Sequence, residues 1–293
     1  MVASNYKIGF FGTGPLAITV LETLSRDYKI LPALIVTQPD KEAGRGLTLT
    51  KGAVKIFAEE KNTPLLQPAT LKDADIVEKL SGFGCDVFLV VSYGKIIPEN
   101  IIESPRYKTV NLHPSVLPKY RGPSPVQATI LSNDTDCGIT LMLIDKEVDH
   151  GPILAQDVFP FEATETTSVA LQAMLGTIGA RLVADALPLY IEGSLKPHEQ
   201  EHEKATYTRK IEKEEGEIFL DSDPKKNILK FNAHYGWPGT YFFYSHKNKP
   251  IRVLVTDASY EEGRFILKNV KPEGKKEMSF EEFVRGYGDP VVI

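Results

Sequence analysis

Asn111 and His113 lie two residues apart, where an apolar run leads into a loop stiffened by Pro114 and Pro118. Side chains alternate along a strand, so an asparagine and a histidine at this spacing project on the same side. The amide donates hydrogen bonds, and an imidazole titrates near neutral pH. Together they could stabilise a developing oxyanion while a proton moves, which is the chemistry of acyl transfer.

A carboxylate that could join this pair is Asp149, in the segment Asp149-His150-Gly151 after a second apolar run. Open α/β sheets bind their ligands at the carboxyl ends of the strands. We therefore expect Asn111, His113 and Asp149 to meet at such an edge, and we predict that they are the catalytic residues. A protein that only binds a ligand is the alternative, and it would not need all three groups.

The composition is that of an ordinary globular protein, with 293 residues, 42% hydrophobic and 25% charged. Cys85 and Cys137 are the only cysteines, and we expect free thiols in a reducing compartment. The first residues lack a signal-peptide pattern, and we predict a cytoplasmic protein without a membrane partner. A net charge of −5 argues against a general nucleic-acid coat but allows a local basic patch.

The first two thirds of the chain alternate short apolar runs with helical stretches, which predicts parallel strands joined by crossover helices. Strands are expected at Lys7–Gly12, Leu31–Thr37, Asp86–Ser92, Thr109–Leu112, Gly138–Ile144 and Ile153–Val158. One helix should begin at Pro15, because proline suits the first helical position. Another, over residues 166–186, places its apolar side chains on one face.

The last third of the chain follows a polar stretch that Gly193 and Pro197 interrupt. Its expected elements are strands at Ile218–Phe219, Thr240–Tyr244, Ile251–Thr256 and Phe265–Val270 and a helix at Pro224–Tyr235. We predict an α/β fold with a Rossmann-like, open, mostly parallel sheet and a small β-rich C-terminal domain. The domains are expected at 1–190 and 206–293, with a linker at 191–205.

Residues 12–17, Gly-Thr-Gly-Pro-Leu-Ala, fit the dinucleotide fingerprint G-x-G-x-x-A after the first strand. That fingerprint needs an acidic residue at the end of the second strand. Thr37 and Gln38 stand at that place, and the first acidic residue beyond it is Asp40. Since tight first turns of α/β sheets favour glycine in any case, we do not expect a dinucleotide cofactor.

Residues 198–202, His-Glu-Gln-Glu-His, match the zinc-protease pattern H-E-x-x-H. A zinc site of this kind needs both histidines on one face of a buried helix. This stretch follows Pro197 in the polar linker and has no apolar flanks. We therefore predict an exposed linker here and no metal site.

The stretch from Asn111 to Gly122, with Pro125 and the turn at 149–151, resembles the signature of the 10-formyltetrahydrofolate-dependent formyltransferases. Further segments are similar to the branch of this family that formylates methionyl-tRNA: Phe10–Thr13, Val36–Gly46, Pro64–Pro68, Thr206–Ile211, Trp237–Thr240 and Lys271–Met278. The resemblance implies formyl transfer from 10-formyltetrahydrofolate to initiator methionyl-tRNA, for translation initiation. This chemistry requires no metal, and we expect a monomer.

The resemblance also implies roles for single residues. Asn111 and His113 would polarise the formyl carbonyl and hold the oxyanion, while Asp149 would orient His113 or relay the amine's proton. The folate ring would lie against Tyr93, Ile96, Ile97 and the turn formed by Ser115, Val116, Leu117 and Pro118.

For the RNA partner, the resemblance implies that the loop from residue 40 to 51 reaches the acceptor end of the tRNA, through Lys41, Arg45 and Lys51. A solvated, glycine-rich surface loop is the alternative interpretation. The family often has more lysines where this chain has residues 47–50, and fewer phosphate contacts weaken salt-dependent binding. Between the strands expected at Ile251–Thr256 and Phe265–Val270 the chain is also shorter than the family's OB-like barrel, so we expect a reduced OB-like C-terminal domain.

The catalytic signature does not select the amine that is formylated. The alternative function is that of an N-formyltransferase acting on a small-molecule amine, such as an amino-sugar nucleotide. The loop around Arg45 and the Lys271–Met278 segment favour tRNA over that alternative.

Overall fold

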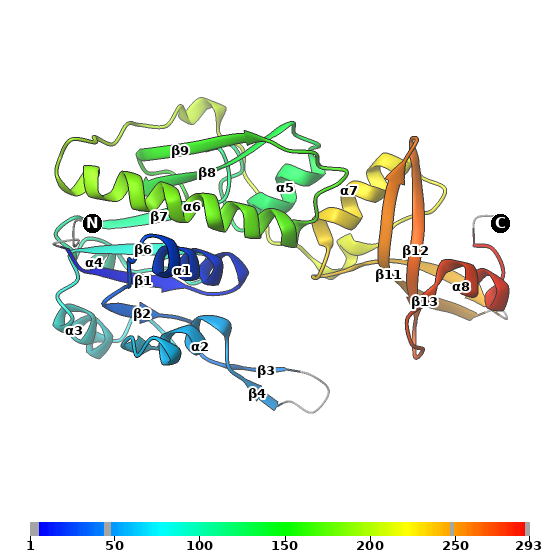
Figure 1. Ribbon diagram of the computed structural model, residues 1–293, viewed down its shortest axis with the longest axis horizontal. Helices are drawn as coiled ribbons and strands as arrows, with labels where there is room; N and C mark the ends of the chain where they lie inside the picture. Colours follow the sequence, from blue (N-terminus) through cyan, green and yellow to red (C-terminus); the bar gives the residue numbers. More distant parts are fainter. Residues whose placement is uncertain (1–5, 44–47, 247–248, 291–293) are drawn as a thin grey trace. The chain divides into compact units, whose positions relative to one another are not determined.

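The computed structural model describes residues 6–43, 48–246 and 249–290. Its largest element is a seven-stranded sheet with the order β5-β2-β1-β6-β7-β8-β9 (Figure 1). The strands are β1 (Ile8–Gly12), β2 (Leu34–Val36), β5 (Leu65–Leu66), β6 (Val87–Val91), β7 (Thr109–His113), β8 (Asp136–Leu143) and β9 (Ile153–Pro160). From β5 to β7 the neighbours are parallel, and β8 runs antiparallel to β7. The predicted Rossmann-like, open, mostly parallel sheet is confirmed.

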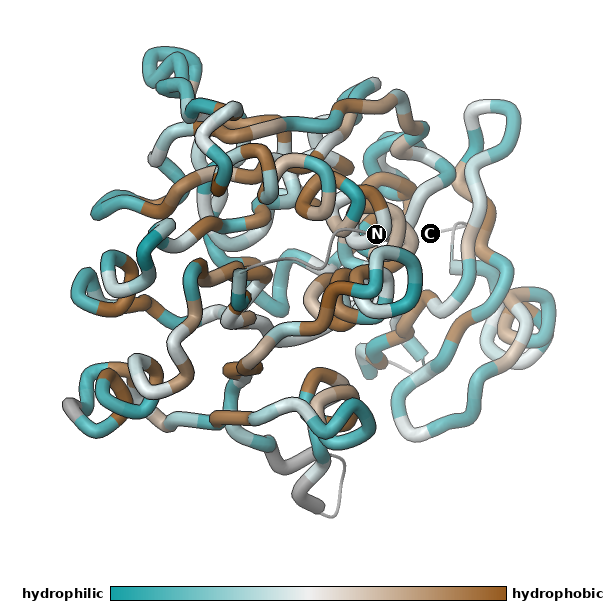
Figure 2. The backbone as a smooth tube through the Cα atoms, turned by 60° about the vertical axis from the view of Figure 1, so that its left-hand side comes forward, coloured by the Kyte–Doolittle hydropathy of each residue, from teal (hydrophilic) through white to brown (hydrophobic). Residues whose placement is uncertain are grey.

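Helices cover both faces of this sheet, and burial on both faces explains the apolar runs along its central strands. Figure 2 shows such hydrophobic stretches of the chain in brown. The helices of this part of the chain are α1 (Pro15–Asp27), α2 (Ala53–Glu60), α3 (Ala74–Gly82), α4 (Glu99–Ile102), α5 (Pro125–Leu131) and α6 (Ser168–Ile191). Phe10 and Phe11, neighbours on β1, are both 0% exposed. Phe11 packs with Leu80 of α3 and Ile101 of α4 in one core cluster. On the other face lies α1, because a Cβ on Gly12 would meet both the Phe10 ring and Ala17.

Helix α6 is, among the helices of the described residues, the one that is long and apolar enough to cross a membrane by length and composition. Its packing accounts for that composition. Added Cβ atoms at two of its glycines show how close the neighbours lie: Gly176 would meet Thr19 of α1, and Gly179 would meet Leu112 of β7. We therefore interpret α6 as a core helix that lies directly on the sheet.

The chain folds into two compact units. Unit 1 comprises Met1–Pro123, Gly138–Val158 and Gln172–Tyr207, and unit 2 comprises Ser124–Cys137, Phe159–Leu171 and Thr208–Ile293. Because the chain passes between them more than once, neither unit is one continuous stretch. The domain limits read from the sequence, 1–190, 191–205 and 206–293, remain a prediction.

Unit 2 contains an antiparallel sheet with the order β10-β11-β12-β13. Its elements are α7 (Pro224–His234), β10 (Thr240–His246), β11 (Lys249–Glu261), β12 (Arg264–Pro272), β13 (Met278–Ser279) and α8 (Phe280–Tyr287). Phe283 of α8 closes the core by packing its ring edge-on against Phe242 and Tyr244 of β10. The β-rich C-terminal region and the helix at Pro224 are confirmed. The strand expected at Ile218–Phe219 is wrong, because the pairing there is an isolated bridge between Glu217 and Tyr241.

His234, at the end of α7, is a buried titratable group in unit 2. Neither ring nitrogen has a hydrogen-bond partner among the described residues. Burial lowers the pKa of His234 below its usual value, nearby Glu215 opposes that shift, and Lys230 adds to it. Protonation of this ring therefore favours the unfolded chain, in which the imidazole is solvated.

We expect the free energy of unfolding to fall as the pH drops below about 6.5, the unfolded histidine value. Below this pH the histidine of the unfolded chain binds a proton, whereas His234 in the folded protein stays neutral. The free energy of unfolding that the protein has at neutral pH is therefore partly lost. The variant His234→Phe should show a shallower slope between neutral and acidic pH in urea titrations. Equal slopes for both proteins would contradict this assignment.

Candidate active site

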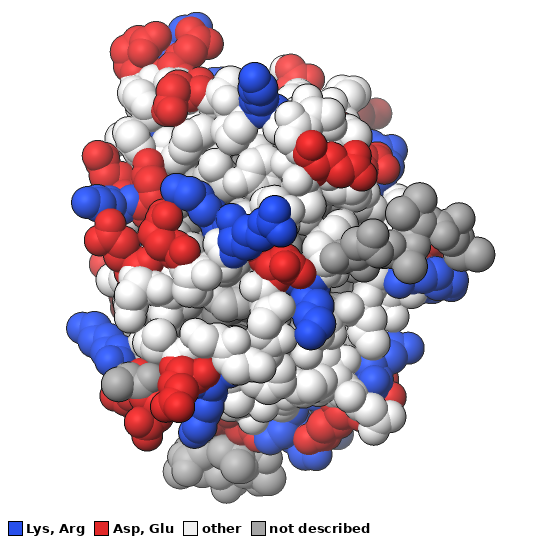
Figure 3. Space-filling model, turned by 90° about the vertical axis from the view of Figure 1, so that its left-hand side faces the viewer, with Lys and Arg blue, Asp and Glu red and all other residues white. Residues whose placement is uncertain are grey.

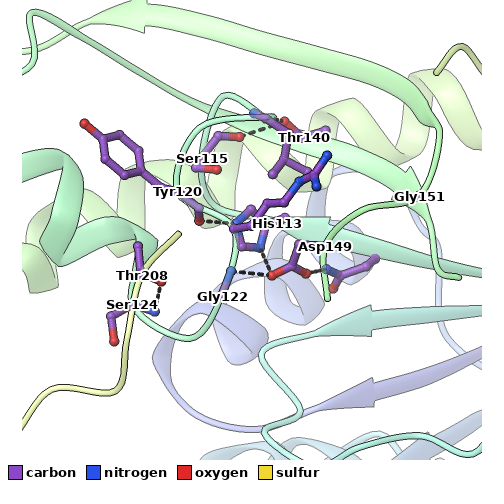
Figure 4. Close-up of polar contacts among 12 residues, drawn as sticks. His113, Ser115, Tyr120, Gly122, Ser124, Thr140, Asp149, Gly151 and Thr208 are labelled. Carbon is purple, nitrogen blue, oxygen red and sulfur yellow. Dashed lines mark hydrogen bonds and ion pairs between the residues drawn. The ribbon is translucent and has the colours of Figure 1, made fainter. Parts of the chain in front are cut away.

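Asp149 is the centre of the polar cluster at the carboxyl end of β7 (Figure 4). Asn111 Nδ2 donates to its Oδ1 at 3.2 Å, and the backbone N–H of Gly122 donates to its Oδ2 at 2.8 Å. His113 Nδ1 lies 3.5 Å from the same Oδ2, an ion-pair distance rather than a good hydrogen bond. The structure therefore brings together the amide, the imidazole and the carboxylate that the sequence singled out.

The ring of His113 is buried, and both of its nitrogens face protein oxygens. Its Nε2 lies 3.0 Å from the carbonyl oxygen of Tyr120. A carbonyl can only accept, so Nε2 must carry the hydrogen, and Nδ1 is the nitrogen that faces Asp149. A ring with both nitrogens protonated would donate to each of these oxygens.

Two loop residues at the site have a backbone that is unusual for amino acids other than glycine. Tyr120 has φ of 62° and Asp149 has φ of 50°. Such left-handed conformations cost a non-glycine residue about 1–2 kcal/mol and persist only where other bonds fix the backbone. At Tyr120 these bonds are its N–H to Thr206 Oγ1, at 2.8 Å, and its carbonyl to His113.

The turn predicted to contact folate is fixed by side chains from the two strands after it. Thr140 of β8 donates its hydroxyl to Ser115 O at 2.7 Å and accepts from Leu117 N. Gln156 of β9 donates to Leu117 O at 2.8 Å. Val116 and Pro118 are half-buried, whereas Ser115 and Leu117 are buried. The four residues thus form one rigid turn that follows His113.

The other residues predicted to contact folate differ in their exposure. Tyr93 is 2% exposed, packs edge-on against Phe11 and has no hydrogen-bond partner for its hydroxyl among the described residues. Burial raises the pKa of Tyr93 to about 12. Ile97 is buried in the same core cluster, whereas Ile96 is 93% exposed. Of the three, Ile96 therefore offers the most surface to a ligand.

The loop predicted to reach tRNA forms a hairpin of β3 (Lys41–Ala43) and β4 (Thr48–Thr50). Arg45 lies outside the described residues, and of Lys41 only the backbone is described. Lys51 forms an ion pair with Glu59 at 2.8 Å. At the start of the hairpin, hydrogen bonds from Lys55 and Gln67 lower the pKa of the Asp40 carboxyl.

The stretch predicted to be an exposed linker is partly buried in unit 1. His198 pairs its backbone with Ile153 of β9, and Gln200 is only 5% exposed. His202 lies in a 3-10 turn (His202–Lys204), so the H-E-x-x-H letters do not form a helix. Gln200 and its partner Arg121, which is fully buried, were not predicted from the sequence. For Arg121 the sequence offered one signal of a role at the site, its place between two loop residues of the signature. For Gln200 it offered none, because a polar stretch does not show which of its residues is buried.

The family described as "Formyl transferase" matches residues 6–187. The chain is also 39% identical over 259 residues to the methionyl-tRNA formyltransferase of Chloroflexus aurantiacus, covering 88% of this chain and 82% of that relative. This chain belongs to the methionyl-tRNA formyltransferase family. The matched region contains the whole polar cluster around Asp149.

Solved structures share the fold of this formyltransferase family member. The methionyl-tRNA formyltransferase of Clostridium thermocellum aligns with a TM-score of 0.61 at 20% identity, over 91% of this chain and 98% of that one. An N-formyltransferase of Helicobacter canadensis, in complex with folinic acid and dTDP-3-aminofucose, aligns with a TM-score of 0.58 at 18% identity. That alignment covers 87% of this chain and 89% of the other. At these identities the likeness concerns the fold alone.

Gly151 cannot carry a side chain, because its Cβ would lie 2.1 Å from the carbonyl oxygen of Leu143. We expect Gly151→Ala to push the loop of Asp149 away from β8 and to destabilise the protein by about 1–3 kcal/mol, the usual cost of overpacking. Urea unfolding measures this. The control Gly82→Ala, where a Cβ meets nothing within 4 Å, should not destabilise the protein. Equal effects of the two substitutions would contradict the tight packing of Gly151.

Proposed function

We propose that this protein transfers the formyl group of 10-formyltetrahydrofolate to the amino group of methionyl-initiator tRNA. The observation that carries the proposal is the gathering of Asn111, His113 and Asp149 in a chain of the methionyl-tRNA formyltransferase family. We also propose that it acts in the cytoplasm as a monomer and that the reaction uses no metal.

In the proposed reaction, the methionyl amine attacks the formyl carbon and forms a tetrahedral intermediate. The bond from that carbon to the folate nitrogen then breaks, the nitrogen gains a proton, and the new amide nitrogen loses one. An asparagine amide carries two hydrogens, so Asn111 can donate one to Asp149 and the other to the oxyanion. The bond to Asp149 orients the amide with its nitrogen at the site.

His113 and Asp149 handle charge and protons in this proposal. Both nitrogens of His113 face protein oxygens, so we propose that the ring acts through its fixed position beside Asp149 and not by transferring a proton itself. The Asp149 carboxylate can accept the proton that the attacking amine releases, directly or through water. The 3.5 Å separation from His113 leaves this pair free to tighten when the substrates bind.

For the folate co-substrate, we propose that Ile96 and the half-buried Val116 and Pro118 of the turn form the contact surface, with Ser115, Leu117, Tyr93 and Ile97 buried behind it. The high exposure of Ile96 and the rigidity of the turn support this proposal. A rigid apolar turn loses little conformational entropy when a flat ring packs on it.

For the tRNA, we propose that Lys41, Arg45 and Lys51 of the hairpin contact the acceptor end. Lys51 would have to exchange Glu59 for a phosphate, and an exposed ion pair of this kind costs little to break. The face in Figure 3 intersperses lysine and arginine with acidic side chains. With a net charge of −5 for the whole chain, a local basic loop is therefore a better candidate for tRNA contact than this face.

Formylation of a small-molecule amine is the second candidate. It is favoured because Asn111, His113 and Asp149 suit any neutral amine, and because the N-formyltransferase of Helicobacter canadensis shares the fold. The two functions are separated by supplying labelled 10-formyltetrahydrofolate with either charged initiator tRNA or an amino-sugar nucleotide. Labelled formylmethionyl-tRNA is the expected product, and exclusive labelling of the sugar would overturn the proposal.

We expect Asn111→Ala to lower kcat by about 10²–10³-fold, because one oxyanion donor is worth roughly 3–4 kcal/mol. The KM for tRNA should change little, since the amide acts on the transition state. Steady-state formylation kinetics measure both constants. The control Asn100→Ala, on the exposed surface of α4, should retain the unmodified rate. A loss below about fivefold for Asn111→Ala would exclude an oxyanion role.

Arg45→Ala should raise the KM for tRNA with little change in the KM for the folate. Loss of one phosphate contact also lowers the salt slope of tRNA binding by about one. Titrations at several salt concentrations measure this slope. Arg26→Ala, which removes an exposed arginine of α1 that pairs with Asp27, serves as the control. An unchanged KM and salt slope for Arg45→Ala would contradict the proposed contact of Arg45 with tRNA.

A further inference from the structure

Arg121 is the largest fully buried side chain of the described residues, with 1% of its surface exposed. Its guanidinium donates from Nε and Nη2 to Gln200 Oε1, at 3.2 and 2.7 Å. Nη2 also lies 2.8 Å from His202 Nδ1, and Nη1 donates to Tyr207 Oη at 3.3 Å. A guanidinium can only donate, so His202 Nδ1 is the acceptor of that bond.

Gln200 carries this network onward to the loop of Asp149. Its Nε2 donates to the carbonyl oxygens of Asp149 and Gly151, at 3.0 and 2.8 Å. The Oε1 faces two donors and the Nε2 faces two acceptors, so one orientation of the amide satisfies all four bonds. Gln200 is buried, so loss of the two bonds at Oε1 or of the two bonds at Nε2 would leave buried polar groups without a partner. Such a loss costs about 1–3 kcal/mol of stability.

The other end of the network holds the loop that contacts His113. The backbone N–H of Arg121 donates to Thr206 O at 2.9 Å. Its two chain neighbours face the catalytic groups: Tyr120 O accepts from His113, and Gly122 N–H donates to Asp149 Oδ2. Arg121 and Gln200 therefore connect the two loops whose groups contact His113 and Asp149.

We propose that Arg121 and Gln200 are positioning residues for the formyl transfer, which together fix Asp149 against Gly122 and His113. This inference rests on the proposed function for its kinetic consequence. Arg121 and Gln200 act on the two loops that carry the site and do not contact the reacting atoms. A displacement of about 1 Å at a catalytic group can cost about 10²-fold in rate. The gain in rate from the Arg121–Gln200 network can therefore outweigh the cost of burying the charge of Arg121.

Gln200→Glu tests the inference with little change of size. The carboxylate still accepts from Arg121, but it presents oxygen to the carbonyls of Asp149 and Gly151, where a donor is needed. We expect kcat for methionyl-tRNA formylation to fall by about tenfold or more, with both KM values within about threefold. The exposed neighbour Glu201, which pairs with Lys204, supplies the control Glu201→Gln.

Hydrogen exchange of the Gly122 amide is a second readout that needs no substrate. This amide donates to the Asp149 carboxylate, so we expect its exchange to become at least about tenfold faster in Gln200→Glu. Glu201→Gln should leave it unchanged. If Gln200→Glu fails to fold by urea titration, Arg121→Lys, which loses the planar fork but keeps the charge, takes its place.

Unchanged kcat or unchanged Gly122 exchange in a folded variant would overturn the inference. If the unmodified protein forms no formylmethionyl-tRNA, the proposed function is wrong, and Gly122 exchange alone then decides whether Arg121 and Gln200 fix Asp149.

Discussion

The site depends on the contacts that the carboxylate of Asp149 makes with its polar neighbours. This carboxylate orients the amide of Asn111, accepts the backbone N–H of Gly122 and faces the ring of His113. A carboxylate has enough lone pairs to accept all of these groups, whereas an asparagine at the same place would set a donor against other donors. The geometry of the site is therefore specified by one negative charge and its hydrogen bonds.

The sheet and the loops share the task of holding this charge. β7 ends at His113 and places Asn111 two residues earlier on the same side, so these groups inherit the rigidity of a buried strand. Asp149 has no such support, because it lies in a loop with a left-handed backbone. Two contacts fix its position instead: Gly151 packs against the carbonyl oxygen of Leu143, and the amide of Gln200 donates to the backbone carbonyl of Asp149.

Most of the fold could be predicted from the sequence, because buried parallel strands give apolar runs and α7 carries a proline at its start. The three polar groups could be predicted as well, since Asn111 and His113 share a strand and Asp149 follows the next one. The buried network could not. Gln200 lies among charged residues, and the sequence of such a polar stretch does not indicate that the side chain of Gln200 is buried. The isolated pairing at Glu217 also gives no strand-length pattern, so the strand prediction at Ile218–Phe219 was wrong.

The most direct test of this account is the single-turnover rate of formyl transfer to methionyl-tRNA in Asp149→Asn. The substitution keeps the size of the side chain and removes the charge. We expect the rate to fall by about 10²-fold or more while the urea unfolding midpoint shows a folded protein, because both the proton acceptor and the orientation of Asn111 are lost. A rate within about threefold of the unmodified protein would contradict the central role of this carboxylate.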